Sequence, residues 1–289
     1  DFIKNQIKKK KKRDKNKEKG TTHGADKGIS LKTTLAILED ESLKIGAIEG
    51  LFTVDEETGL TGAFALAEDM LTGKMLFNLD SEDWGVLTVG CAGGGNSDIT
   101  LPTKKEDLSG DFTGLKINIS GLRGGHSGVD VHEQRANAVK ILARILWKGS
   151  EKYDIKISDI SGGDKHNAIP REANGIVAVE KSKKADFEKM IKDEEKAIQE
   201  EYKPIDPGLK IKISDEKISK VLNKDSQTKF LNLLNGLPHG VIKMSYDIDG
   251  LVQTSTNLAK TETKETNVNI LLSSRSAVMS ELHYLRDQI

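Results

Sequence analysis

Carboxylates at three turns are the side chains of this sequence most able to do chemistry. The turns are Gly24-Ala25-Asp26-Lys27-Gly28, Asp55-Glu56-Glu57-Thr58-Gly59 and Asn78-Leu79-Asp80-Ser81-Glu82. A hydrolytic site with two metal ions needs a bridging anion, terminal ligands and a separate base for the attacking water. Asp26 could bridge two metals, and Asp80 could be a terminal ligand. Of the adjacent Glu56 and Glu57, one could bind metal while the other holds the water.

Each of these turns also has an ordinary structural explanation. Asp26 could cap a helix, the two glutamates could supply the acidic first turn of another helix, and Asp80 could simply end a strand. The glutamates and Asp80 follow apolar runs at 47–54 and 75–79, which are typical of buried strands. Ligands of an α/β sheet lie beyond the carboxyl ends of its strands. The shared placement therefore favours a metal site at one edge of a sheet.

A second group of candidates is suited to binding a substrate. His126 lies in the glycine-rich run Gly124-Gly125-His126-Ser127-Gly128 and could contact a substrate carbonyl oxygen or carboxylate. The glycines could instead cradle a phosphate, but the lysine spacing of a phosphate loop is absent. Asn167 could hydrogen-bond a substrate. Arg275 follows an apolar strand and could bind a carboxylate with its forked guanidinium. The alternative for His126 is a plain loop histidine, and the alternative for Arg275 is a surface salt bridge.

Helical and strand-like patterns alternate along the chain, which predicts an α/β fold. In the first part we expect helices at 29–40 and 61–71 and strands at 47–54, 75–79 and 86–91. The glycine- and charge-rich stretch 93–111, with Pro102, is interpreted as a boundary with an exposed linker near 103–111. In the second part we expect strands at 114–120, 153–159, 174–180, 208–213, 249–259 and 266–273, and helices at 133–147, 184–201, 225–235 and 276–287. The predicted domains are therefore a lysine-rich segment over 1–20, a first domain over 21–111 and a second α/β domain over 112–289.

Composition narrows the class of protein. The 289 residues carry a net charge of −1, but residues 1–20 hold ten Lys or Arg against three Asp or Glu. We interpret that segment as a solvated tail rather than a nucleic-acid site, because no basic stripe with interleaved aromatic residues follows. No apolar run approaches the roughly 18 residues of a membrane span. The single cysteine, Cys91, rules out an internal disulfide and indicates a reducing, cytoplasmic location.

The motifs taken together resemble a known family. The chain is similar to the cytosolic aminoacyl-histidine (Xaa-His) dipeptidases, which are di-zinc metallopeptidases of the aminoacylase and carboxypeptidase type. The resemblance rests on residues 20–28, 51–59, 76–82, Val89-Gly90-Cys91-Ala92-Gly93-Gly94, 121–128, Asn167-Ala168-Ile169-Pro170-Arg171-Glu172-Ala173 and Ser273-Ser274-Arg275-Ser276. Their order and spacing run from about residue 20 to the end.

The resemblance implies a role for each candidate. Asp26 would bridge two zinc ions, Glu57 and Asp80 would be ligands, one for each metal, and Glu56 would be the general base. His126, Asn167 and Arg275 would belong to a lid domain that holds the dipeptide by its carbonyl oxygen and carboxylate. The implied fold is a zinc-binding α/β domain with an inserted α/β lid. The implied partners are a dipeptide substrate and a second copy in a homodimer, without nucleic acid or membrane.

The sequence also departs from the family pattern. The family has a His-x-Asp motif upstream of the Asp26 segment and a distal histidine ligand, and neither has a counterpart between Asp1 and Ile289. Lys27 stands where the family has a neutral asparagine, and its charge would oppose a nearby metal. The chain thus resembles the middle of the enzyme, a partial catalytic domain followed by the lid.

Two functions follow from these observations. In the first, the chain is an incomplete or impaired copy of a metal-dependent dipeptidase that acts on Xaa-His dipeptides. In the second, it is a non-catalytic pseudo-peptidase fragment whose lid domain mediates association. The missing imidazoles favour the second, and the intact Asp26, Glu56, Glu57 and His126 favour descent from the first.

Overall fold

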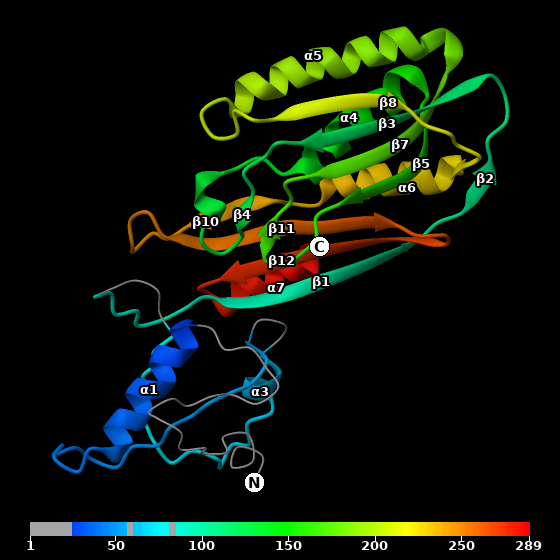
Figure 1. Cartoon of the computed structure of the whole chain (residues 1–289). Helices are drawn as coiled ribbons and strands as arrows, with labels where there is room; N and C mark the ends of the chain where they lie inside the picture. The colour runs from blue at the N-terminus through cyan, green and yellow to red at the C-terminus, as the bar shows by residue number, and fades with distance from the viewer. Residues whose placement is uncertain (1–24, 57–59, 81–84) are drawn as a thin grey trace, which may run out of the picture. The chain divides into compact units, whose positions relative to one another are not determined.

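The structure is a computed structural model that describes residues 25–56, 60–80 and 85–289. The predicted lysine-rich segment over 1–20 and the candidate ligand Glu57 lie outside the described residues. The chain divides into two compact units, Asp1–Val89 and Gly90–Ile289, called unit 1 and unit 2 below. Figure 1 shows their elements, and each unit is described by itself.

Two helices of unit 1 lie wholly within its described part. Helix α1 spans Ala25–Glu39 and confirms the helix expected at 29–40, although it begins earlier. Helix α3 spans only Thr61–Phe64, shorter than the expected 61–71. Gly50 packs against α1, because a Cβ at Gly50 would lie 3.1 Å from Thr34 Cγ2 and 3.4 Å from Leu38 Cδ1.

The strands predicted in unit 1 are wrong for its described residues. Within the part of the chain that the structure describes, the segments 47–54, 75–79 and 86–89 have no ladder partner and are irregular, and so are residues 90–91 of the expected strand 86–91. A strand needs a neighbour for its backbone N–H and C=O groups, and apolar character alone cannot supply one. Their side chains are correspondingly open: Met75 is 82% exposed and Val89 is 92% exposed.

Unit 2 is built on one large antiparallel sheet. The strands run in the order β1-β12-β11-β5-β7-β3-β8, and β10 pairs with β11. Their bounds are β1 Gly93–Pro102, β3 Phe112–Ser120, β5 Lys156–Gly162, β7 Ala173–Glu180, β8 Lys210–Asp215, β10 Gly240–Met244, β11 Val252–Thr263 and β12 Asn267–Ser276. Two small ladders join β2 (Lys105–Asp107) to β9 (Lys220–Leu222), and β4 (Gly125–His126) to β6 (Ala168–Ile169).

Helices of unit 2 pack on this sheet. They are α4 Ala138–Tyr153, α5 Lys184–Tyr202, α6 Lys224–Gly236 and α7 Met279–Gln288. The core joins Leu142 of α4, Phe187 of α5 and Phe230 of α6 to Leu115 of β3 and Val177 of β7, all of them fully buried. This arrangement confirms a mixed α/β fold. Each element predicted after residue 112 is present, although α4 is displaced from the expected helix 133–147 and β10 of the large sheet has no counterpart in the prediction.

The stretch 93–111 is not the linker that its composition predicts. Residues 93–102 form β1, which pairs with β12 along its whole length, and residues 105–107 form β2. The units divide at Val89, so the predicted division at 111/112 falls inside unit 2. The three glycines of β1 are misleading because, in an edge strand, they need only pair by their backbone groups.

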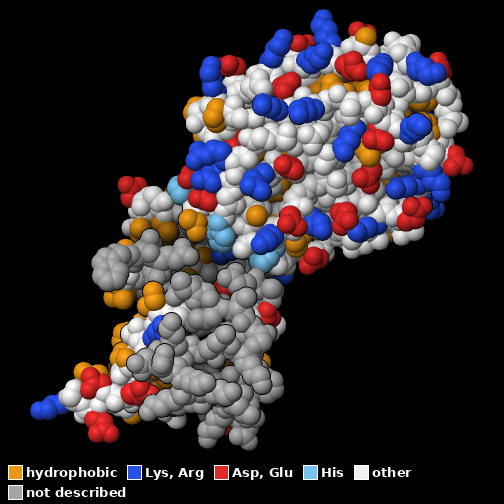
Figure 2. Space-filling model, in the orientation of Figure 1, with side chains coloured by type: hydrophobic (Ala, Val, Ile, Leu, Met, Phe, Trp, Pro, Cys, Tyr) orange, Lys and Arg blue, Asp and Glu red, His pale blue; other side chains and the backbone are white. Residues whose placement is uncertain are grey.

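Charges are interspersed over unit 2. Acidic and basic side chains interleave on the face that Figure 2 shows. Arg144 of α4, for instance, pairs with Glu194 at 3.1 Å and with Glu201 at 2.8 Å on α5. No helix of the described residues is long and apolar enough to cross a membrane.

Candidate functional site

The candidate catalytic carboxylates lie in unit 1. Glu56 and Asp80 are both exposed, whereas Glu57 and the side chain of Asp26 lie outside the described residues. The backbone of Asp26 is in the first turn of α1. Ser30, one turn further along α1, donates its hydroxyl to the carbonyl of Leu79 at 2.9 Å. This bond places the segment that leads into Asp80 against the helix that carries Asp26.

The described carboxylates of this group, Glu56 and Asp80, do not by themselves make a zinc site. Within the described ranges, no three His, Cys, Asp or Glu side chains gather closely enough to hold a metal ion. Zinc sites in proteins usually combine three or four ligands with imidazole or thiolate among them. The donors within those ranges are two exposed carboxylates, which do not meet that requirement.

The three predicted substrate-binding residues lie in unit 2, where the chain brings their segments together. β4 carries His126 and pairs with β6, so that His126 lies opposite Ala168, the neighbour of Asn167. The backbone N–H of Ser127 donates to the carbonyl of Asn167 at 2.8 Å. The His126 and Asn167 loops are thus hydrogen-bonded to each other across 40 residues of sequence.

Arg275 joins this pair through Gly128. It lies on β12, opposite Ser255 of β11 and Gly94 of β1. A Cβ added at Gly128 would lie 2.9 Å from Arg275 Cζ and 3.0 Å from Nε, so the guanidinium rests against the glycine backbone. A side chain at this position would force the guanidinium to shift, which gives a physical reason for the glycine two positions after His126.

The ring of His126 is held in one tautomer. Its Nδ1 accepts the backbone N–H groups of Gly128 and Val129, each at 3.2 Å. A nitrogen that accepts carries no proton, so the neutral ring is protonated on Nε2. Burial lowers the pKa of His126, the positive charge of Arg275 lowers it further, and Asp130 opposes both. The imidazole is therefore neutral near pH 7 and offers an N–H donor from Nε2.

Several buried polar atoms of this region have no partner among the described residues. They are Ser127 Oγ, Asn257 Oδ1 and Arg275 Nε. Buried polar groups in folded proteins are nearly always hydrogen-bonded, so such atoms indicate a place for water or a ligand. Asn257 shares a face of β11 with Ser255, the residue opposite Arg275. The unpartnered atoms thus belong to the same neighbourhood as His126 and Arg275.

Residues that support this site carry little signal in the sequence. Asp130 Oδ2 accepts the backbone N–H of His126 at 2.7 Å, and Arg135 NH1 donates to the carbonyl of Gly124 at 2.5 Å. Asn257 Nδ2 donates to the carbonyls of His166 and Ala168 at 3.2 and 2.8 Å, on either side of Asn167. The position of Asp130, four residues after His126, is only a weak indication of a turn. No sequence pattern predicts a supporting role for Asn257.

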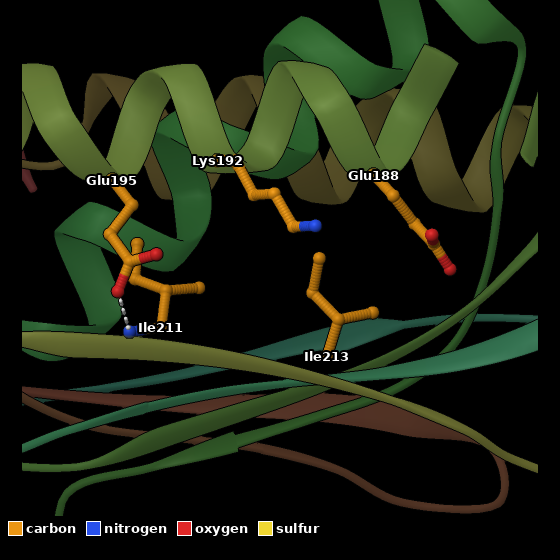
Figure 3. Close-up of a pocket in the computed structure, with 5 residues that line it drawn as sticks. All are labelled: Glu188, Lys192, Glu195, Ile211 and Ile213. Atoms are coloured by element: carbon orange, nitrogen blue, oxygen red, sulfur yellow. Dashed lines mark hydrogen bonds between the residues drawn. The ribbon is translucent and has the colours of Figure 1, made fainter. Parts of the chain in front are cut away.

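A separate hollow of unit 2 lies between α5 and β8. It is lined by Glu188, Lys192, Glu195, Ile211 and Ile213 (Figure 3). Glu195 there accepts the backbone N–H of Ile211 at 2.7 Å, which ties the helix to the edge strand. The His126 region is the better candidate for a binding site, because it brings together an imidazole, a guanidinium and buried polar atoms that have no partner among the described residues.

Known proteins are similar to this chain in sequence and in fold. The sequence model of the peptidase dimerisation domain family matches residues 115–206. The cytosol non-specific dipeptidase of Escherichia coli (strain K12) is 36% identical over 270 residues, which is 93% of this chain and 56% of the relative. The crystal structure of aminoacylhistidine dipeptidase from Vibrio alginolyticus superposes with a TM-score of 0.79 at 34% identity, over 93% of this chain and 57% of that one. Over 93% of its length, this chain is similar in sequence and fold to an aminoacylhistidine dipeptidase.

The match covers nearly the whole chain but only part of its relatives. The chain spans a little over half the length of the two dipeptidases. The uncharacterized protein YqjE of Bacillus subtilis (strain 168) is more distant, at 28% identity over 220 residues, which is 69% of this chain and 54% of that protein. Over the part of the dipeptidase that it covers, the chain therefore has the mixed fold of an aminoacylhistidine dipeptidase, and residues 115–206 of unit 2 match the peptidase dimerisation domain.

Proposed function

We propose that this protein acts in metal-dependent hydrolysis of dipeptides of the Xaa-His type, with unit 2 holding the substrate. One observation carries the proposal: His126, with its donor on Nε2, and Arg275, with an unpartnered buried Nε, meet around Gly128. A dipeptide offers a peptide carbonyl and a carboxylate within a few ångströms of each other. An imidazole N–H and a guanidinium fork match those two groups.

The proposed roles follow from the donors. His126 donates from Nε2 to the peptide carbonyl oxygen and stabilises the negative charge that develops there. Arg275 pairs with the substrate carboxylate, and the amide of Asn167 donates to the same end of the substrate. Asn257 keeps Asn167 in place through the two carbonyls that flank it. The neutral state of His126 is favoured, because a protonated imidazole would be repelled by the positive charge of Arg275.

The carboxylates of unit 1 complete the proposal. Asp26, Glu57 and Asp80 are the proposed zinc ligands, and Glu56 is the proposed general base. Support comes from the dipeptidase relatives and from the bond between Ser30 and Leu79, which brings the Asp80 segment to α1. Because Asp26, Glu57 and Asp80 supply carboxylates only, without the imidazole or thiolate that zinc sites usually include, we propose weak zinc binding and slow turnover of dipeptides.

Activity and metal content test this proposal together. The chain is assayed with β-alanyl-histidine in added zinc, beside the variants Glu56→Gln and Arg275→Gln, and bound metal per chain is measured after dialysis. We expect slow turnover that Glu56→Gln abolishes and that Arg275→Gln reduces through KM. Turnover unchanged by Glu56→Gln would overturn the assigned base. An unchanged KM in Arg275→Gln would overturn the proposal that Arg275 binds the substrate carboxylate.

Self-association is a second proposed function of unit 2. The match of residues 115–206 to a peptidase dimerisation domain favours it, and we propose a homodimer. The proposed cellular location is the cytoplasm, on the basis of the free, exposed Cys91 and the cytosolic relative. Sedimentation velocity over a hundredfold range of concentration tests the association. A species of twice the chain mass is expected, and a monomer at every concentration would contradict the dimer.

A further inference from the structure

A buried carboxylate outside the proposed site holds both ends of the His126 loop. Asp206 is 0% exposed and lies in the turn between α5 and β8. Its Oδ1 accepts the backbone N–H of Arg123 at 2.7 Å, and its Oδ2 accepts the backbone N–H of Ala136 at 2.8 Å. These two residues bracket the segment that contains His126 and the short helix Val131–Glu133.

The turn that carries Asp206 is itself fixed. The backbone N–H of Asp206 donates to the carbonyl of Tyr202, at the end of α5, at 2.7 Å. The backbone carbonyl of Asp206 accepts the N–H of Leu209 at 3.1 Å. Gly208 approaches Gly121 so closely that a Cβ at Gly121 would lie 2.0 Å from the Gly208 oxygen. The anchor is therefore rigid, and it belongs to the end of α5 rather than to the loop.

A carboxylate suits this place better than any other side chain. Two backbone donors point at one buried group, and an ionised carboxylate supplies an acceptor oxygen to each. An amide of the same size has one acceptor and would turn an N–H₂ donor towards the other backbone N–H. Inside the loop, Asp130 and Glu133 pair with Arg135, at 3.2 and 2.8 Å.

We propose that Asp206 is a positioning residue that fixes the His126 loop to the end of α5, so that the imidazole faces Arg275. The loop spans thirteen peptide bonds between Arg123 and Ala136, and a clamp at its two ends removes most of its freedom to move. For its meaning in catalysis the inference rests on the proposed function, but the clamp itself is a property of the chain without substrate.

The variant Asp206→Asn tests the clamp in the 289-residue chain. NMR follows the ring nitrogens of His126 and the amide exchange of His126 and Ser127, without any peptide. We expect those amides to exchange roughly tenfold to a hundredfold faster, since charge-assisted bonds of this kind are strong. We also expect the Nδ1 signal to move towards that of a free histidine, and the pKa of His126 to rise towards its ordinary value of 6.5.

The matched control is Glu195→Gln. Glu195 of α5 likewise accepts a backbone N–H, that of Ile211 in β8 at 2.7 Å (Figure 3), whereas the two backbone donors of the clamp bond Asp206. Glu195→Gln should leave the His126 signals unchanged. Unchanged His126 signals in Asp206→Asn, or equal changes in both variants, would overturn the clamp.

A measurement on the unmodified chain covers the case in which Asp206→Asn does not fold. In native-state hydrogen exchange with increasing urea, the amides of Arg123 and Ala136 should open together with those of His126 and Ser127, with one free energy and one slope. Independent opening of Arg123 and Ala136 would overturn the clamp. Dipeptide binding by His126→Ala is measured separately: unchanged binding there would refute the proposed role of His126 while leaving the clamp intact.

Discussion

The guanidinium of Arg275 lies against the backbone of Gly128, close enough that a methyl group at Gly128 would meet Arg275 Cζ at 2.9 Å. This contact joins the strand β12 to the loop that carries His126, which is 149 residues away in sequence. It gives the proposed site its geometry, because the carboxylate-binding group and the carbonyl-binding group are both placed by it.

Replacing Gly128 by alanine should therefore weaken substrate binding. The added methyl group forces Arg275 aside, and we expect the Kd for a dipeptide to rise about tenfold, or about 1.4 kcal/mol. Isothermal titration measures it. Gly236→Ala is the control, since a Cβ at Gly236 meets nothing within 4 Å. Equal affinity of Gly128→Ala and Gly236→Ala would contradict the contact's proposed importance.

Removing the side chain of Asn257 should loosen the Asn167 loop. Asn257→Ala leaves the carbonyls of His166 and Ala168 without their donor, and we expect about 1–3 kcal/mol less stability in urea unfolding. The amide signal of Asn167 should shift as well. Asn118→Ala, which removes one side-chain bond to Asn174 on the sheet, is the comparison. A shift of Asn167 in that variant too, or in neither, would argue against a specific role for Asn257.

Stability should fall on mild acidification because of His239. Burial lowers its pKa to about 4, with a smaller contribution from the charge of Lys140. The unfolded chain then binds the proton more readily than the folded one, so stability is present above pH 6.5 and is lost as the pH falls towards 4. The loss should approach about 3 kcal/mol.

The variant His239→Asn isolates this effect. Asparagine keeps an acceptor near the position of Nδ1, which faces Asn137 Nδ2 at 3.3 Å and Leu258 N at 3.4 Å, but it does not titrate. The difference in unfolding free energy between the two proteins should change between pH 7 and pH 4.5. A constant difference over that range would show that the pKa of His239 is not lowered by folding.

Protease cleavage should fall at the division between the units. Val86, Leu87 and Val89 are exposed and irregular, whereas residues 93–102 and 105–107 are hydrogen-bonded strands. Limited proteolysis followed by mass spectrometry should therefore cut near 85–92. First cuts within 103–111 would instead support the linker that composition alone predicts.

The sequence predicts most of unit 2 after residue 112 but predicts unit 1 and the start of unit 2 poorly, for a physical reason. Segments such as α5 and β7 carry their own period of apolar residues, so local pattern is enough to place them. β1 escapes prediction because Gly93-Gly94-Gly95 and Pro102 are typical of a break in structure, although an edge strand tolerates both. The strands expected at 47–54 and 75–79 depend on distant partners, and local pattern cannot supply those.

The candidate site is likewise only partly predictable from the sequence. Residue types and a family resemblance are enough to select His126, Asn167 and Arg275, but not to show that their segments touch. That depends on the β4–β6 ladder and on Gly128. Asp206 cannot be selected from the sequence, because it stands between Pro204 and Pro207 in a stretch that predicts only the end of a helix.

Binding of a dipeptide carboxylate by Arg275 is the contact on which the proposed function depends most. The most direct measurement compares the Kd of β-alanyl-histidine with that of its C-terminal amide, for the unmodified chain, Arg275→Gln and the control Arg286→Gln on α7. We predict that the acid binds at least about tenfold more tightly than the amide, that Arg275→Gln abolishes this preference and that Arg286→Gln keeps it. Equal binding of acid and amide by the unmodified chain would contradict the proposed role of Arg275.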